Sequence, residues 1–196
     1  MAKRVILGGL LGGVALFFWG AVAHMLTPLG ATGFSRLPVD REDALRASMK
    51  AAVTADGMYL YPGADMNKPM TTSEEAVWTA KLKDGPSGLL LIRTGAVEPG
   101  MSRQLMTEFG TNVVSAVLAG LLLAATRLRF AGRVGFVTLL GLFATLTVNV
   151  PYWNWYGFRT DFTAAALIEH VVGWLIVGLV LGAIVKHPAP AESSFA

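Results

Sequence analysis

Glu169 and His170 are neighbours inside a long apolar stretch of the sequence, and a second histidine, His24, lies near the end of another. A charged side chain well inside a membrane helix costs about 2.5–3.5 kcal/mol on insertion scales, so it is first considered as a functional group. We expect Glu169 to face the interior of a helix bundle, with a partner such as His24, Arg159 or an asparagine. Glutamate can also act as a general acid or base, which makes membrane enzyme chemistry one interpretation.

The two histidines suggest a more specific site, a haem b held by His24 and His170 from two helices. Ligands of one iron must reach almost the same point. His24 lies about two residues from the end of its stretch and His170 lies about eight residues into the other, a difference of roughly 9 Å of helical rise. This difference in depth within the membrane argues against both histidines binding one iron, although helix tilt can absorb part of the difference. A haem or quinone site formed by His24, Glu169 and His170 therefore remains the alternative to a protein without a cofactor.

Two asparagines, Asn112 and Asn149, lie at the ends of rows of residues spaced by four in other apolar stretches. Together with the histidines they predict a polar cluster toward one end of a bundle. Interhelical hydrogen bonds in membranes contribute on the order of 0.6 kcal/mol each. We favour this structural role for both asparagines over ligand binding.

Two further groups of residues predict interaction surfaces. Trp153, Trp155 and Tyr156 belong to an aromatic segment that could dock a partner, although the aromatic belt at a membrane surface has the same composition. Gly178 and Gly182 have the spacing of close helix contacts, either within the chain or with another chain.

These residues must be positioned by four long apolar stretches in a chain of 196 residues, of which 54% are hydrophobic and 15% charged. The mean hydropathy of +0.54 is above that of soluble domains. Crossing a bilayer takes about 20 apolar residues. We predict a membrane protein, mainly α, with a four-helix transmembrane bundle over residues 1–26, 102–128, 134–151 and 162–185. An aromatic loop over 152–161 and a tail over 186–196 complete the division.

The basic residues beside these stretches predict an orientation. They all fall on one side, which places both termini in the cytoplasm of a bacterial inner membrane by the positive-inside rule: Lys3, Arg4, Arg127, Arg129, Arg133 and Lys186. A cleaved signal peptide ending at residues 21–23 is the alternative for the first stretch. The apolar run there is longer than the usual 7–15 residues or so of such a signal, and this favours a membrane helix.

Residues 27–101 separate the first two stretches and are too many to form a structureless loop, so they should fold as an extracytoplasmic α+β insertion. Asp40 is expected to cap a helix to about Val53, and Asp56-Gly57 to turn into a strand over 58–61. A second helix is expected from Ser73 to about Leu82, followed by a strand over 88–93. So small a unit buries little surface and should pack on the bundle, a second copy or a partner.

Composition also excludes several functional classes. The chain has no cysteine, which rules out disulfides, thiol catalysis and iron–sulfur clusters held by thiolates. Nothing in it resembles a metalloprotease, serine hydrolase, P-loop or dinucleotide-binding motif. The net charge of +3 is not accompanied by a nucleic-acid-binding motif, so no nucleic-acid partner is expected.

The leading hypothesis is a non-enzymatic accessory, scaffold or assembly subunit of a bacterial cytoplasmic-membrane complex. Its expected partners are the lipid bilayer and either other membrane subunits or copies of itself, bound through small-residue helix faces and the external insertion. The alternative is a protein that binds a lipophilic ligand or a redox cofactor, haem or quinone, at a polar site in the outer leaflet. Membrane enzyme chemistry is the third hypothesis.

Overall fold

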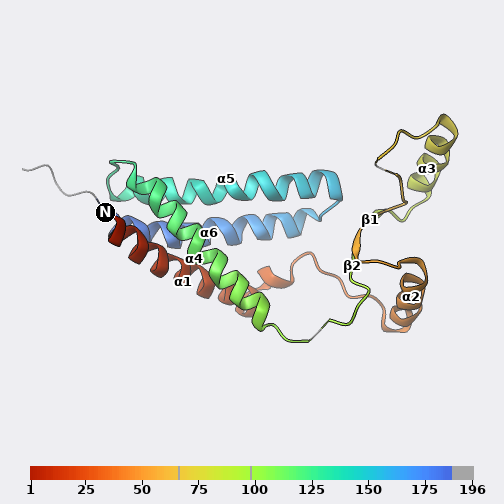
Figure 1. Cartoon of the computed structure of the whole chain (residues 1–196), viewed down its shortest axis with the longest axis horizontal. Coiled ribbons are helices and arrows are strands. Elements are labelled where there is room, and N and C mark those ends of the chain that lie inside the picture. The colour runs from red at the N-terminus through yellow and green to blue at the C-terminus, as the bar shows by residue number, and fades with distance from the viewer. Residues whose placement is uncertain (66, 98, 187–196) are drawn as a thin grey trace, which may run out of the picture. The chain divides into compact units, whose positions relative to one another are not determined.

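The computed structural model describes residues 1–65, 67–97 and 99–186, and is mainly helical. The predicted tail over 186–196 lies, apart from Lys186, outside the described residues. The elements, in chain order, are α1 (Ala2–Leu26), η1 (Pro28–Ala31), α2 (Val39–Ala52), β1 (Gly57–Tyr61), α3 (Thr72–Asp84), β2 (Gly88–Ile92), α4 (Ser102–Ala124), α5 (Phe130–Tyr156) and α6 (Thr160–Ile184) (Figure 1).

Four of these helices, α1, α4, α5 and α6, are long and apolar enough to cross a membrane. They coincide with the four apolar stretches predicted from the sequence, with shifted boundaries. Helix α4 ends at Ala124 rather than near residue 128. Helix α5 continues through Pro151 to Tyr156, so most of the aromatic segment expected as a loop is helical, and residues 157–159 form the connection. Proline is tolerated inside helices of this type because neighbouring groups can satisfy the freed carbonyl.

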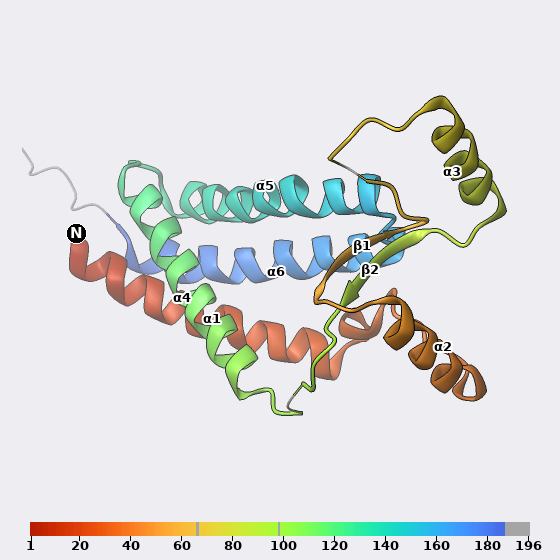
Figure 2. The same ribbon diagram turned by 45° about the vertical axis from the view of Figure 1, so that its right-hand side comes forward.

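The chain divides into two compact units. The bundle unit consists of the described residues in 1–33, 100–151 and 159–186, and the insertion unit consists of those in 34–99 and 152–158. In the bundle unit, the starts of α1 and α5 and the ends of α4 and α6 lie together, as Figures 1 and 2 show. We call this the basic end, because it carries Lys3, Arg4, Arg127, Arg129, Arg133 and Lys186.

Helix α1 lies between α4 and α6, and glycines set its distance from α4. A Cβ atom added at Gly9 would lie 2.8 Å from the Cα of Val117, and one added at Gly13 would lie 2.5 Å from the Cα of Val113. Both contacts are with backbone atoms, which no side-chain rotation can move. The two helices therefore approach as closely as they do because neither position carries a side chain.

Glycines also allow close contact at other helix interfaces of the bundle. Gly8 and Gly12 face Leu181 and Val177 of α6, and Gly141 of α5 receives the ring of Trp174. The residues buried between these helices form one apolar core: Val5, Ala116, Ala119, Leu123, Val137, Val177, Leu181 and Val185.

The insertion unit is built on an antiparallel pair of strands, in which Met58 of β1 faces Leu91 of β2. Both strands lie where the sequence predicted them. The helix starts differ, since α2 begins after Pro38 with no side-chain cap and Asp40 lies in its first turn. Helix α3 begins at Thr72, one residue before its expected start at Ser73, with a capping box in which Thr71 and Glu74 satisfy each other's backbone N–H groups.

The insertion unit has little hydrophobic core. No residue of α2 or α3 is buried. Hydrogen bonds connect parts of this unit: the Trp78 indole donates to the Pro62 carbonyl at 3.1 Å, and the Thr94 backbone N–H and hydroxyl both donate to Asp56 at 2.8 and 2.7 Å. These two hydrogen bonds hold the pKa of Asp56 below its usual value, because they favour its charged form.

Candidate functional site

Two ionisable side chains, His24 of α1 and Glu169 of α6, lie in contact at the end of the bundle opposite the basic end. His24 Nε2 lies 3.1 Å from Glu169 Oε1. The Glu169 side chain is 19% exposed and the His24 side chain 58%, so the carboxylate is covered and the imidazole is open on one side. His24 is one of the partners that the sequence suggested for Glu169.

The antiparallel packing of the two helices explains how these side chains meet. Gly12 lies against Val177 and Leu16 against Gly173, and this register continued would place residue 24 opposite residue 165. Glu169 is four residues away from that level, about 6 Å of rise. Helical side chains lean toward the N-terminus of their own helix, so in an antiparallel pair His24 and Glu169 lean toward each other and close this gap.

Two neighbouring groups fix the pair. The Trp19 indole on α1 donates to the backbone carbonyl of Glu169 at 2.9 Å, which locks the register of α1 on α6. On the other side, η1 turns back over the end of α1. A Cβ at Gly30 would lie 2.6 Å from the Cα of His24, so the turn packs directly on the histidine.

Sequence reasoning missed the turn η1. Its start is defined by Thr27, whose hydroxyl donates to the carbonyl of Ala23 at 2.6 Å and accepts from the N–H of Leu29 at 3.2 Å. Threonine followed by Pro28 is a recognisable signal for a new helical turn, since proline is favoured at the first helical position. That signal could have shown that the chain folds back over His24.

The other polar residues of the predicted cluster are not brought to this pair. His170 is exposed, and its Nδ1 lies 2.8 Å from the carbonyl of Ala166 in its own helix. Asn149 donates to the carbonyl of Thr145, also in its own helix, at 3.3 Å. Of the predicted cluster of His24, Asn112, Asn149 and His170, the member that the structure shows in contact with Glu169 is His24.

Asn112 is buried, at 8% exposure, but lies deeper in the bundle. The next residue of α4, Val113, packs on Gly13 of α1. Gly13 precedes His24 by eleven residues, about 16 Å of helical rise. Asn112 thus belongs to the interface between α1 and α4 and not to the environment of Glu169.

The aromatic residues predicted as an interaction surface lie in the last turns of α5. Tyr152 stacks on Phe158 with ring centroids 5.5 Å apart and lies 5.9 Å from Tyr156. Trp155 is 77% exposed and Trp153 is 44% exposed. The tyrosines thus form a small aromatic cluster, while Trp155 presents most of its ring outward.

Gly178 and Gly182 pack inside the chain. A Cβ at Gly178 would lie 2.9 Å from the carbonyl oxygen of Val134, and one at Gly182 would lie 3.2 Å from a methyl carbon of the same valine. Both glycines are buried against the start of α5. Of the two uses that their spacing allowed, the structure shows contact within the chain.

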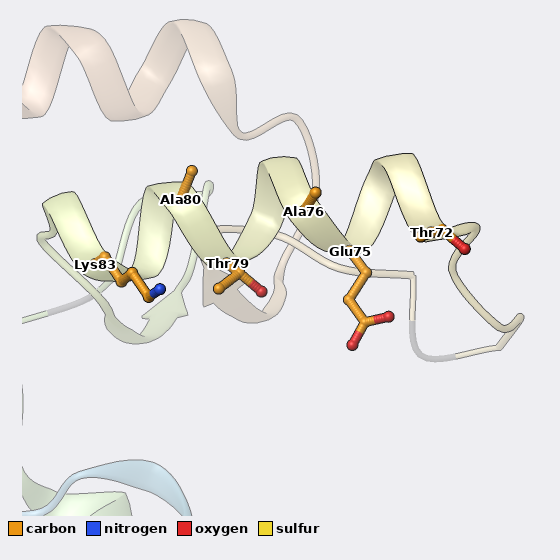
Figure 3. Close-up of a pocket in the computed structure, with 6 residues that line it drawn as sticks. All are labelled: Thr72, Glu75, Ala76, Thr79, Ala80 and Lys83. Atoms are coloured by element: carbon orange, nitrogen blue, oxygen red, sulfur yellow. The ribbon is translucent and has the colours of Figure 1, made fainter.

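The insertion unit carries a surface hollow along one side of α3 (Figure 3). All its lining residues belong to this helix: Thr72, Glu75, Ala76, Thr79, Ala80 and Lys83. Because no second element closes over it, the hollow lacks the convergent polar groups that a small-molecule site needs.

The chemistry available is that of one carboxylate–imidazole pair. Such a pair can share a proton or hold a hydrogen-bonding group of a lipid or quinone. In the part of the chain that the structure describes, no three histidine or acidic side chains are grouped as a metal site would require.

Comparison of the chain with protein-family models, with curated proteins and with solved structures found no significant match.

Proposed function

We propose that this chain is a non-enzymatic assembly subunit of a bacterial cytoplasmic-membrane complex. In this proposal the four long helices span the membrane, both termini and the basic end lie in the cytoplasm, and the insertion unit lies outside. The insertion unit binds a protein partner, either another subunit or a second copy.

The uncovered apolar face of the two-stranded sheet is the observation that supports this proposal best. Met58 and Leu91 are cross-strand partners and are both 65% exposed. Leu60 lies on the same face and is 39% exposed. A two-stranded sheet is marginal in water, and becomes stable when its hydrophobic face packs on something else.

The small-residue helix faces do not serve this role in the proposal, because Gly8, Gly9, Gly12, Gly13, Gly178 and Gly182 all pack within the bundle unit. The Trp155 ring, at 77% exposure, offers an additional contact for a partner or for the lipid interface.

The test is isolation of the full chain from its native membrane in mild detergent, followed by mass determination of the intact particle. We expect a stoichiometric second subunit or a homo-oligomer. Leu91→Glu should release the partner, while Val77→Glu, a matched change on α3 at 57% exposure, should not. A wild-type chain that is monomeric and alone, or equal behaviour of the two variants, contradicts the proposal.

A second candidate function is binding of a lipophilic ligand or redox cofactor beside His24 and Glu169. The 3.1 Å contact between these two side chains within a span favours it, because an intramembrane carboxylate marks functional sites by default. Absorption spectra and lipid extraction of the purified protein test it. A chromophore or lipid that is retained by the wild type and lost in Glu169→Gln supports it, whereas identical contents in both exclude it.

A further inference from the structure

The basic end of the bundle holds six cationic side chains from four separate segments. Lys3 and Arg4 begin α1, Arg127 and Arg129 lie between α4 and α5, and the start of α5 and the end of α6 contribute one each. Figure 2 shows these segments gathered around the N-terminus. The described acidic residues of the bundle unit, Glu108, Asp161 and Glu169, all lie in the first halves of α4 and α6, toward the other end.

Two of the arginines are fixed by the C-terminus of α6. The Arg4 Nη1 donates to the carbonyl of Lys186 at 2.6 Å, and the Arg133 Nη1 donates to the carbonyl of Val185 at 3.2 Å. Carbonyl groups at a helix end carry partial negative charge, so they attract cations there. These bonds bring Arg4, Arg133 and Lys186 around a single helix terminus.

Some hydrogen-bond donors near this helix terminus have no acceptor among the described residues. Among the described residues, Arg133 Nε is the buried side-chain nitrogen that lacks a hydrogen-bond partner. Arg127 and Arg129 are exposed, and in the described part of the chain neither belongs to an ion pair. A guanidinium has five N–H donors, and a cluster of them without a carboxylate is unbalanced in both charge and hydrogen bonding.

We propose that the basic end binds the phosphate of an anionic phospholipid headgroup. Arg127 and Arg129 are its main contacts. The positive charges of Arg4, Arg133 and Lys186 surround this site. Phosphate oxygens match the guanidinium fork, and basic pockets between membrane helices bind anionic headgroups in this way. The proposal requires the helices to span a membrane, as in the proposed function, but requires no protein partner.

A lipid is favoured over a free phosphate ion by the position of the site. The cations surround the ends of helices whose lengths match a bilayer, and Leu128 between the two loop arginines is 42% exposed. An apolar side chain between the two arginines suits a ligand with both a headgroup and acyl chains. Free phosphate offers nothing for that side chain to contact.

The experiment uses the full chain in phosphatidylcholine nanodiscs with and without phosphatidylglycerol, with bound lipid counted by native mass spectrometry after release. We expect phosphatidylglycerol to be enriched around the wild type. The double variant Arg127→Gln/Arg129→Gln should lose affinity by about 25-fold, since each cation near an anionic surface contributes about fivefold. Arg46→Gln/Arg103→Gln removes the same charge from α2 and from the start of α4, and should keep the enrichment.

Three results overturn the proposal: no enrichment around the wild type, equal loss in both double variants, or full displacement of the lipid by millimolar inorganic phosphate. Helical content measured by circular dichroism confirms that each variant is folded. If the loop variant fails to fold, the salt dependence of the wild type decides, because a site made of charges must weaken as the salt concentration rises. Loss of the protein partner in the Leu91→Glu test leaves lipid enrichment unaffected, so the two proposals fail separately.

Discussion

Gly13→Ala is the sharpest test of how the bundle is held together. The Cβ atom that this change adds would lie 2.5 Å from the Cα and 2.8 Å from the backbone nitrogen of Val113. Carbon atoms in contact are separated by about 3.5–4.0 Å, so α4 would have to move by about 1 Å along much of its interface with α1.

Overpacking of this kind costs about 1–3 kcal/mol, and the backbone contact puts Gly13→Ala at the upper part of that range. For a chain of this size, 1 kcal/mol corresponds to about 2–4 °C in Tm, so we expect a fall of roughly 5–12 °C. The assay is the loss of the monodisperse peak in size-exclusion chromatography after heating detergent-solubilised protein at a series of temperatures. Because such unfolding is often irreversible, the heating time is held constant.

Gly20→Ala is the matched control on the same helix, because a Cβ at Gly20 meets nothing within 4 Å. Alanine is also better than glycine in a helix by about 1 kcal/mol, so this control should be as stable as the wild type or more so. If Gly13→Ala behaves like Gly20→Ala, the close approach of α1 and α4 is wrong.

Three further predictions concern single contacts. Thr71→Ala removes the capping box of α3 and should speed hydrogen exchange in its first turn, with a loss of about 1 kcal/mol; unchanged exchange would contradict the cap. The lowered pKa of Asp56 means that its hydrogen bonds from Thr94 contribute fully above about pH 4 and are lost as the pH falls through the lowered value. The protection factors of the strand-pair amides, which correct for the pH dependence of intrinsic exchange, should therefore fall at low pH in the wild type and change less in Asp56→Asn. Trp19→Phe keeps a smaller aromatic ring but removes the hydrogen bond to the Glu169 carbonyl, and loss of that bond should cost about 0.5–1.5 kcal/mol by thermal unfolding, whereas a wild-type Tm would argue against that bond.

The four long helices and both strands were predictable from the sequence because each depends on local information. A span needs a run of apolar residues of fixed minimum length, and the first strand was marked by the turn residues Asp56-Gly57 before it. Boundaries were less predictable. The aromatic segment read as a loop because its tyrosines and tryptophans suit a membrane surface, yet the same residues continue α5 past Pro151.

The candidate site was predicted only in part, because it depends on the rotation and register of whole helices. Glu169 and His24 were identified by their type and position, but composition does not show which face of a helix meets its neighbour. Asn149 and His170 lie at positions that the spacing rule placed toward the cluster, and in the structure each bonds to a carbonyl of its own helix instead. In a helix interior a polar side chain always has such a local acceptor nearby, so its presence alone does not imply a contact across helices.

The glycines of α1 link the fold to the proposed role. Gly8 faces α6, Gly9 and Gly13 face α4, and Gly12 lies between Ala116 of α4 and Val177 of α6, so the glycines of one helix are fitted to two neighbours. These four glycines are therefore not available for contact with another chain. A protein partner would therefore have to bind the exposed apolar residues of the insertion unit, the outward rings of α5 or the exposed apolar side chains of the four long helices. Substitutions at Gly9 or Gly13 should therefore destabilise the chain itself before they affect any assembly, whereas substitutions at Met58 or Leu91 should affect assembly first.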